Sequence, residues 1–428
     1  MDILIEFFSF RDPNIRFVVL GSVILAASSA VVGTFTFLKK RALSGDAVAH
    51  SVLPGVCLAF VLAGNKNPFA LIIGAFVTGW ISLICIDIIT RKSKIKEDTA
   101  IGLVLSVFFG MGILFLTAIQ RSGNAAQSGL DHFLFGKAAS LIGEDLWVFG
   151  ITGVLLIFTI AAFYKELKII SFDPQFAYAS GLPVKMLDLL LTSLTVLAVV
   201  IGIQAVGVVL MAAMLITPAA AAKYWTNKLI TMILLAAAFG AFSGITGAFI
   251  SYVAPSMPTG PWIVVVISMI AVGSFFFAPK KGIISKEIQQ NKNKNKILED
   301  NILKLFYHLS EGKKDFYAGR SVSDMMEKRH MEEGLLQKGL QRLIKKGLIV
   351  KKNDRWQLTG EGKTKGQRVV KLHRLWELYL TSHLQIAPDH VHEDAETIEH
   401  VITPEIEKAL EKLLKYPAID PHKEDIPY

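Results

Sequence analysis

Nine long runs of apolar residues constrain the fold of this chain more than any other feature of its sequence. A run of about 20 apolar residues, with a lower limit of about 17, is long enough to cross a bilayer as a helix. The runs occupy residues 17–38, 47–63, 69–89, 100–119, 146–163, 186–203, 206–224, 229–253 and 262–278. Because 52% of the 428 residues are hydrophobic, an ordinary soluble domain is excluded. We therefore expect a mainly α-helical, polytopic membrane domain of eight or nine spans.

Basic residues in the connections predict the orientation of these spans. They follow the first, third, fifth and ninth runs, as Lys39, Lys40, Arg41, Arg91, Lys92, Lys94, Lys96, Lys165, Lys168, Lys185, Lys280 and Lys281. Lysine and arginine are enriched in cytoplasmic loops. Nine spans then leave the N-terminus outside and the long C-terminal tail in the cytoplasm, although Lys66 and Arg121 lie in loops on the opposite side.

The second run carries two ionisable residues near its start, Asp46 and His50. In a helix their i, i+4 spacing puts both side chains on one face, about 6 Å apart. Ionisable groups inside a membrane are costly and usually mark a pathway for something polar or charged, so the pair is a candidate site for a divalent cation. Alternatively, Asp46 caps the helix at the headgroup level, Pro54 only kinks the span, and His50 is an ordinary packing histidine. The residues alone leave both interpretations open.

Residues 171–184 predict a short helix in a cytoplasmic loop. Asp173 is a good N-cap, and Pro174 suits the first turn. Gly181 suits the C-terminal stop, and Pro183 prevents continuation. Its larger apolar residues are Phe176, Tyr178 and Leu182. They need a partner, which is either the groove of a separate motor subunit or the chain's own helical bundle.

Two glycines in the eighth run, Gly240 and Gly244, have the GxxxG spacing. Glycines at this spacing let two helix backbones approach closely. We expect the close approach to be made within the chain and not between two chains.

The last 130 or so residues contain amphipathic patterns but no spanning run, which predicts a separate domain. Residues 282–296 are rich in Lys, Asn and Gln and predict a linker or a helical extension. Helical patterns at 321–328 and 332–346 precede a strand, turn and strand between 347 and 362. Helix, helix and hairpin is the order of a winged helix.

Several histidines and glutamates of the tail have helical spacing. His392, Glu396, Glu399 and His400 fall on one side of a predicted helix, and His373 with Glu377 repeats the i, i+4 pairing on another. Clustered carboxylates and imidazoles form a good site for a divalent metal. The alternative is that these are solvated helix faces, as such residues usually are.

Four stretches of the membrane domain resemble the permease family of manganese, zinc and iron ABC importers. They are SGDAVAHSVLPG, EDTAIGLVLS, FDPQFAYASGLPV and QAVGVVLMAAMLITPAAAA, and the resemblance covers residues 18–278. It implies a bacterial plasma-membrane permease, paired with a second permease subunit, driven by a separate ATPase and supplied by an extracytoplasmic metal-binding protein. It also implies that Asp46 and His50 lie on the metal pathway. The implied ATPase contacts are Phe172, Asp173, Pro174, Phe176, Gly181 and Pro183.

The tail is similar to the iron- and manganese-dependent repressors related to the diphtheria toxin repressor. The motifs are QLTGEGKTKG, KLHRLWELYL, HEDAETIEH and YPAIDPHKEDIP, within residues 296–428. The similarity implies metal ligands at Asp300, His373, Glu396, Glu399 and His400, and a second site at Glu377 and His392. Oxygen ligands at Asp300 and Glu396, where iron-type members use sulfur, favour manganese. Leu303 stands where manganese-type members carry a further carboxylate.

These patterns predict a permease domain at 1–281, a linker at 282–296, a winged-helix domain at 297–365 and a helical metal-binding and dimerisation segment at 366–428. We expect a non-enzymatic transport subunit for divalent metal, manganese favoured and zinc or iron possible, with a metal-sensing tail. A membrane-anchored, metal-responsive transcription regulator is the alternative, and a secondary transporter is a third possibility.

Nucleic-acid binding is disfavoured because Glu332 and Glu333 begin the recognition-helix candidate. GEGKT at 360–364 is no nucleotide loop, since Gln357 stands where that motif needs glycine.

Overall fold

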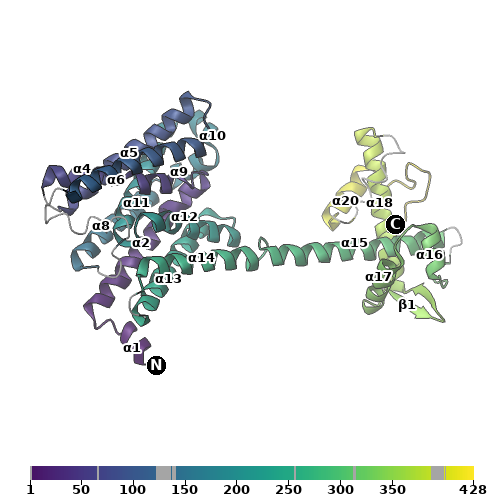
Figure 1. The fold of residues 1–428 in the computed structure, drawn as a ribbon. Coiled ribbons are helices and arrows are strands. Elements are labelled where there is room, and N and C mark those ends of the chain that lie inside the picture. Colours follow the sequence, from purple (N-terminus) through teal and green to yellow (C-terminus); the bar gives the residue numbers. More distant parts are fainter. Residues whose placement is uncertain are drawn as a thin grey trace. The chain divides into compact units, whose positions relative to one another are not determined.

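The computed structural model describes residues 2–64, 67–121, 136, 141–254, 257–311, 315–386, 400 and 402–428. The chain divides into two compact units, Met1–Ser285 and Lys286–Tyr428 (Figure 1).

All regular secondary structure in the described part of the first unit is helical. Its helices are α1 (Asp2–Phe8), α2 (Pro13–Leu38), α3 (Ser44–Ser51), α4 (Leu53–Ala63), α5 (Pro68–Lys92), α6 (Glu97–Arg121), α8 (Gly143–Ala162), α9 (Tyr164–Phe172), α10 (Pro174–Ala179), α11 (Val184–Val206), α12 (Val208–Trp225), α13 (Leu229–Val253) and α14 (Thr259–Phe277). In the part of the chain that the structure describes, nine segments are long and apolar enough to cross a membrane, with α3 and α4 together forming one. The expected polytopic architecture is confirmed.

Local chemistry explains several of the helix ends. The carboxylate of Asp12 accepts a hydrogen bond from the Asn14 N–H at 2.8 Å, so it caps α2 one residue before Pro13. Asn67 caps α5 in the same way. Between α11 and α12 the chain turns at Gly207, whose φ of 85° is open to glycine and unfavourable for other residues.

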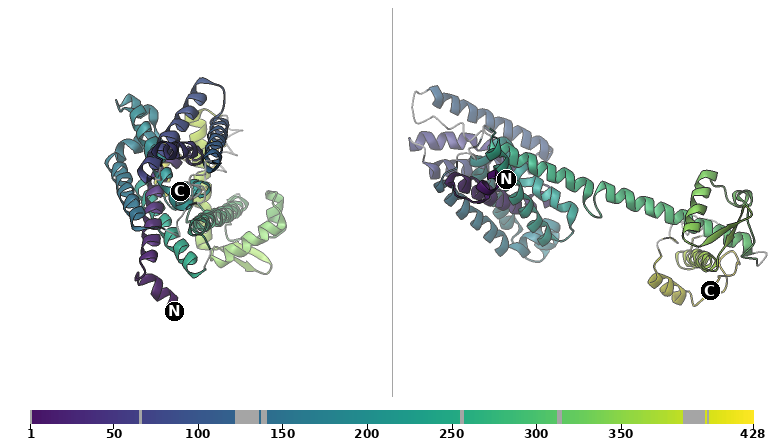
Figure 2. Two further views of the ribbon diagram at one scale, coloured as in Figure 1. Left: turned by 60° about the vertical axis from the view of Figure 1, so that its left-hand side comes forward. Right: turned by 90° about the horizontal axis from the view of Figure 1, so that it is seen from below.

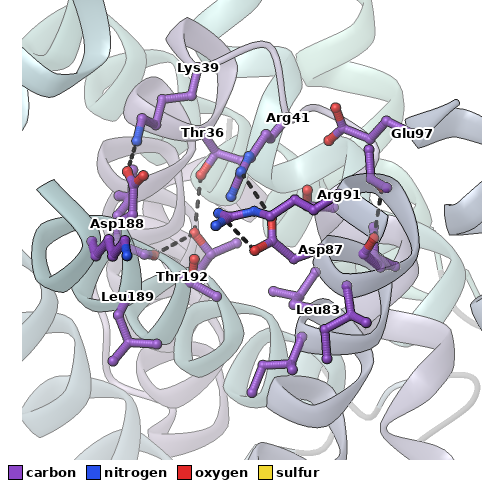
Figure 3. A pocket seen from close by; sticks show the side chains of 18 residues that line it. Thr36, Lys39, Arg41, Leu83, Asp87, Arg91, Glu97, Asp188, Leu189 and Thr192 are labelled. Atoms are coloured by element: carbon purple, nitrogen blue, oxygen red, sulfur yellow. Dashed lines mark hydrogen bonds and ion pairs between the residues drawn. The ribbon is translucent and has the colours of Figure 1, made fainter. Parts of the chain in front are cut away.

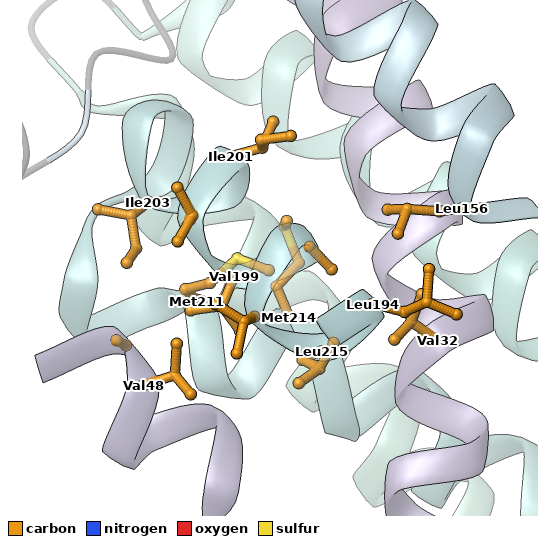
Figure 4. Close-up of a cluster of buried hydrophobic side chains, with 14 of the residues drawn as sticks. Val32, Val48, Leu156, Leu194, Val199, Ile201, Ile203, Met211, Met214 and Leu215 are labelled. Atoms are coloured by element: carbon orange, nitrogen blue, oxygen red, sulfur yellow. The ribbon is translucent and has the colours of Figure 1, made fainter. Parts of the chain in front are cut away.

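Helix α2 lies at the centre of this unit and packs against α8, α11, α12 and α13. Apolar side chains from α2, α3, α11 and α12 converge there, and Figure 4 shows Val32, Leu194 and Leu215 meeting from three different helices. Because these side chains are fully or almost fully buried within the chain, this part of the bundle is a protein core and not a lipid-facing surface.

Glycines allow the backbone of α2 to approach its neighbours closely. A Cβ atom added to Gly33 would lie 1.7 Å from the carbonyl oxygen of Leu215 in α12. A Cβ on Gly240 would lie 2.6 Å from the carbonyl oxygen of Ala26, and one on Gly244 would lie 3.0 Å from that of Ser22. The GxxxG of α13 thus packs on α2 of the same chain, as the sequence analysis predicted.

The second unit contains α15 (Ile283–Glu311) from Lys286 onward and six further elements. They are α16 (Val322–Lys328), α17 (Glu333–Lys345), β1 (Ile349–Lys352), β2 (Arg355–Leu358), α18 (Gly360–Leu384) and α20 (Pro404–Leu413), seen from other directions in Figure 2. The predicted helix, helix and hairpin are confirmed. The strands are antiparallel, with Ile349 opposite Leu358, and they turn at Asn353 and Asp354. Both turn residues have positive φ, 48° and 56°, as two-residue hairpin turns require.

A small apolar core holds the winged helix together. Leu303 and Phe306 of α15, Leu336 and Leu340 of α17, and Leu358 of β2 are all buried in it. Behind the wing, Thr359 caps α18 by accepting the Gly362 N–H at 3.1 Å, so the GEGKT stretch opens a helix beside the wing.

We expect Gly33→Ala to destabilise the permease unit by about 1 to 3 kcal/mol, because the added methyl group meets the backbone of α12. Gly102→Ala in α6 is the matched control, since a Cβ atom there meets nothing within 4 Å. Thermal unfolding of the purified chain in detergent measures both. Equal midpoints for the two variants would contradict the close packing of α2 on α12.

Candidate metal sites

Asp46 and His50 lie on α3, the first part of a kinked membrane span. The helix bends at Val52, two residues before Pro54. Proline has no N–H to donate to the carbonyl four residues earlier, which here is that of His50. Val52 itself keeps helical dihedrals, with φ −78° and ψ −21°, and the Val56 N–H donates to its carbonyl at 3.1 Å. The span therefore bends directly after the residue pair, as a proline kink does.

The two side chains point toward one another across one helical turn. The distance from Asp46 Oδ1 to His50 Nε2 is 3.5 Å, and the side chains are 39% and 21% exposed. His50 Nδ1 is buried and has no hydrogen-bond partner among the described residues. The imidazole ring meets Phe109 of α6 edge-on, with 5.3 Å between ring centroids. A packing histidine whose polar atoms are satisfied would not have this arrangement.

The capping interpretation of Asp46 does not match the helix boundary. Helix α3 begins at Ser44 with Leu43 as its N-cap, and the helix has no side-chain capping hydrogen bond. Asp46 lies within the first turn, on the face that it shares with His50.

One oxygen and one nitrogen 3.5 Å apart can ligate the same cation, because metal–oxygen and metal–nitrogen bonds are each about 2.0 to 2.2 Å long for ions such as zinc. Two protein ligands fill only part of a coordination shell. The remaining positions are left to water or to ligands from another subunit, and such a partial set binds weakly enough to release its ion.

The predicted short helix is α10, and its ends are as expected. Asp173 Oδ1 accepts the Phe176 N–H at 2.9 Å, Pro174 occupies the first turn, and Gly181 has a φ of 79° after the last turn. Ala177 is buried against the bundle, and Leu182 is half-buried. The larger apolar side chains are exposed, namely Phe172, Phe176 and Tyr178. Most of the apolar surface of α10 is thus left open.

A cavity of about 480 Å³ lies where α2 and α5 end and α6 and α11 begin, and charged side chains line it (Figure 3). Lys39 points to Asp188 of α11 and forms an ion pair with it. The guanidinium groups of Arg41 and Arg91 approach different oxygens of the Asp87 carboxylate, Oδ1 at 3.6 Å and Oδ2 at 2.8 Å respectively. Burial, with a smaller effect from the charge of Arg41, lowers the pKa of Lys39 to about 8.

The sequence analysis missed these ion pairs. It used Lys39, Arg41 and Arg91 only as orientation signals and did not consider Asp87 and Asp188. Both aspartates stand inside or beside apolar runs, in CIDII and MLDLL. An acidic residue in such a position needs a compensating charge, and that signal was present in the sequence.

In the C-terminal unit the described metal-ligand candidates form two pairs. His373 Nε2 lies 3.0 Å from Glu377 Oε1 on α18, and both side chains are almost fully buried. His400 Nδ1 lies 3.3 Å from Asp300 Oδ2 of α15, and its ring is also buried. Three further candidates, His392, Glu396 and Glu399, lie outside the described residues.

These donors suit a divalent cation of intermediate hardness. They are buried imidazole nitrogens and carboxylate oxygens, without sulfur among the described members. Leu303 is fully buried in the core of the winged helix, so it supplies no ligand.

A third group, His308, Glu311 and Glu424, also lies close enough together to hold an ion. However, Arg374 donates to both oxygens of Glu311, at 2.7 Å and 2.9 Å, and pairs with Glu424. Burial and nearby cations lower the pKa of His308 to about 4. Because an arginine already neutralises the carboxylates, we interpret this group as an ion-pair cluster that fastens the C-terminal residues to α18.

Each of the two structural units contains a match to a known protein family. Residues 11–278 match the ABC 3 transport family, and residues 359–428 match the iron dependent repressor metal binding and dimerisation domain. The chain is 42% identical over 379 residues to the manganese transport system membrane protein of Bacillus subtilis, a match that covers 88% of this chain and 86% of the relative. It is 41% identical over 275 residues to the zinc transport system membrane protein of Treponema pallidum, covering 64% of this chain and 92% of that one.

Among solved structures, PsaBC from Streptococcus pneumoniae is similar, with a TM-score of 0.59 and 35% identity over 65% of this chain and 97% of that chain. The family match spans more than half of the sequence and covers every described segment that is both long and apolar enough to cross a membrane. The chain therefore belongs to the ABC 3 transport family, and it combines this multi-pass membrane unit with a C-terminal domain of the iron-dependent repressor type.

Proposed function

We propose that the chain is the permease subunit of an ATP-driven importer of divalent transition metal, and that Asp46 and His50 hold the metal during its passage. The observation that carries the proposal is the 3.5 Å contact between these side chains in a kinked membrane span, with one buried imidazole nitrogen left without a partner among the described residues. A bare dication cannot cross a bilayer unless ligands replace part of its water shell. A carboxylate and an imidazole supply such ligands.

The incomplete ligand set favours a paired permease. Each chain offers one oxygen and one nitrogen at this position, whereas divalent transition metals take four to six ligands as a rule. We infer that a second permease subunit, identical or similar, faces the first and contributes a matching pair. Water completes the shell.

The donor chemistry favours manganese as cargo, with zinc or iron as alternatives. Carboxylate oxygen suits manganese, and imidazole suits zinc and iron as well. The two relatives described above are named as manganese and zinc transport proteins, which supports this range. No soft sulfur ligand accompanies the pair in the described contacts.

Transport against a gradient needs a motor, and α10 is the surface that would engage it. Phe176 and Tyr178 are exposed on a helix with well-defined ends, and the exposed Phe172 ends α9 just before it. An exposed apolar helix of this kind can dock in a groove. We propose that a separate ATPase subunit binds there on the cytoplasmic side. An extracytoplasmic metal-binding protein would deliver the cargo on the other side.

For the C-terminal unit we propose a sensor of cytosolic metal. His373 with Glu377, and Asp300 with His400, would hold the ion, and bound metal would supply the positive charge that compensates these buried carboxylates. These residues come from α15, α18 and the segment before α20, so occupancy would fix the relative positions of those elements. The proposed result is restraint of uptake when metal is abundant.

The charges of the winged helix do not favour DNA binding. Glu332 and Glu333 stand at the start of α17, where a recognition helix approaches the DNA. Among the basic residues nearby, Lys346 pairs with Glu299 at 2.5 Å and Lys351 pairs with Asp354 at 2.7 Å. These contacts support a sensor and not a membrane-anchored transcription regulator.

We expect Asp46→Asn and His50→Gln each to lower manganese uptake by about tenfold or more, since even partners outside the ligand shell cost about 10- to 100-fold in metal affinity. Uptake of radioactive manganese by cells that lack another importer measures this. Normal uptake by variants that insert normally would contradict the proposed pathway.

The double variant Phe176→Ser and Tyr178→Ser should lose the ATPase subunit and with it ATP-dependent uptake. The permease unit itself should stay folded, because both side chains are exposed. Co-purification of the ATPase from detergent extracts provides the measurement. Lys165→Ser, on the exposed surface of neighbouring α9, is the control and should retain the subunit.

Removing residues 286–428 should leave the initial rate of uptake intact but abolish its decline in manganese-rich medium. The pair of substitutions His373→Gln and Glu377→Gln should have the same effect in the full chain. Time courses of uptake after growth in low and high manganese distinguish these outcomes. If the truncated permease is missing from the membrane, the tail has a structural role and not a sensing one.

A further inference from the structure

We propose that Lys39 is a positioning residue for transport, and that its ion pair with Asp188 transmits movement of α10 to the metal-binding helix α3. The inference rests on the proposed function, because it assumes that α10 binds the motor and that α3 holds the cargo. It concerns residues at which no metal or ATPase contact is proposed.

The five residues between α2 and α3 are fixed at two points. Lys39 pairs with Asp188 of α11, and Arg41 lies 3.6 Å from Asp87 of α5, which Arg91 also contacts (Figure 3). Thr36 and Thr195 strengthen the first contact, since their hydroxyl oxygens lie 3.1 Å apart. The connection that leads into α3 is therefore held by α11 on one side and by α5 on the other.

Asp188 lies close to α10 along the chain. Helix α10 ends at Ala179, and α11 begins at Val184, so Asp188 stands near the first turn of the helix that follows. The link between them is short and internally bonded, with the Leu182 N–H donating to the Ala177 carbonyl at 3.1 Å and the Val184 N–H to the Leu182 carbonyl at 2.8 Å. A displacement of α10 thus moves the start of α11 with little slack.

Lys39 is also connected along the chain to Asp46 and His50, through the short segment that joins α2 to α3. Ser44, the first residue of α3, lines the cavity that contains the ion pairs, and its N–H donates to the Arg41 carbonyl at 3.1 Å. Asp46 follows two residues later, in the first turn of α3. Moving Lys39 and Arg41 therefore changes the position of the helical turn that carries Asp46 and His50.

Lys39 depends on the ion pair more than Asp188 does, because its side chain is less exposed to water. The side chain of Lys39 is 12% exposed and that of Asp188 is 30% exposed. An ammonium group so far removed from water needs a nearby carboxylate, whereas an unpaired Asp188 can still be hydrated. Lys39→Met removes the link with little effect on folding, and Asp188→Asn leaves a buried charge uncompensated.

The experiment uses the full chain reconstituted in vesicles with its ATPase and its metal-binding protein, and it measures manganese uptake together with ATP hydrolysis. For Lys39→Met we expect the maximal uptake rate to fall several-fold, the manganese concentration at half-maximal rate to stay unchanged, and the ATP used per manganese ion to rise. Lys40→Met, at the exposed neighbouring side chain, should behave as the unmodified chain. Exchange of the two charges, Lys39→Asp with Asp188→Lys, should restore most of the rate.

Unchanged uptake and an unchanged ratio of ATP to manganese in Lys39→Met would overturn the inference. So would a loss of uptake that accompanies a lower thermal midpoint, because the pair would then only stabilise the fold, and so would a charge exchange that restores nothing. Absence of ATP-dependent uptake by the unmodified chain, or normal uptake by Asp46→Asn, refutes the proposed function instead and is distinguished by those two measurements.

Discussion

The structure depends on the cost of placing a carboxylate and an imidazole inside a membrane span. A span that needed only to be a stable helix would not contain Asp46 and His50. Helix α3 carries both residues directly before the bend at Pro54. Their 3.5 Å contact lowers the cost by letting each side chain serve the other, yet one nitrogen of the imidazole stays unpartnered within the described residues. This arrangement supports the proposal that the pair holds a cation temporarily.

The surrounding helices pack against α3 but leave the side chains of Asp46 and His50 partly exposed. Helix α3 rests on α5, α6, α11 and α12, and the central helix α2 is fixed to α12 and α13 by glycines that bring backbones into contact. Such packing is rigid, so movement is concentrated at the ends of helices and in their connections. The ion pairs of Lys39 and Arg41 lie at one of these ends, between the exposed helix α10 and the metal pair. In the proposed mechanism, these few short contacts join motor binding to cargo binding.

Much of this could be predicted from the sequence, for identifiable reasons. Long apolar runs fix the spans, i, i+4 spacing puts Asp46 beside His50 and His373 beside Glu377, and the order of caps and breakers fixes α10. The ion pair between Lys39 and Asp188 could not be predicted, because the two residues are 149 positions apart and a single sequence does not show which helices pack together. The ion pairs of Arg374 could not be predicted either, because Glu311 and Glu424 are distant from it in the sequence and approach it only when the chain folds. The exposure of Phe176 and Tyr178 also required the three-dimensional structure, since an amphipathic pattern does not reveal which face the bundle covers.

The most direct test of the central claim is pulsed electron paramagnetic resonance of manganese bound to the purified full-length chain, which detects coupling between the metal and a ligating imidazole nitrogen. The account predicts a class of bound manganese whose nitrogen coupling disappears in His50→Gln, while manganese bound to the C-terminal domain keeps its signal. Identical manganese content and identical nitrogen coupling in the unmodified chain and the variant would contradict it.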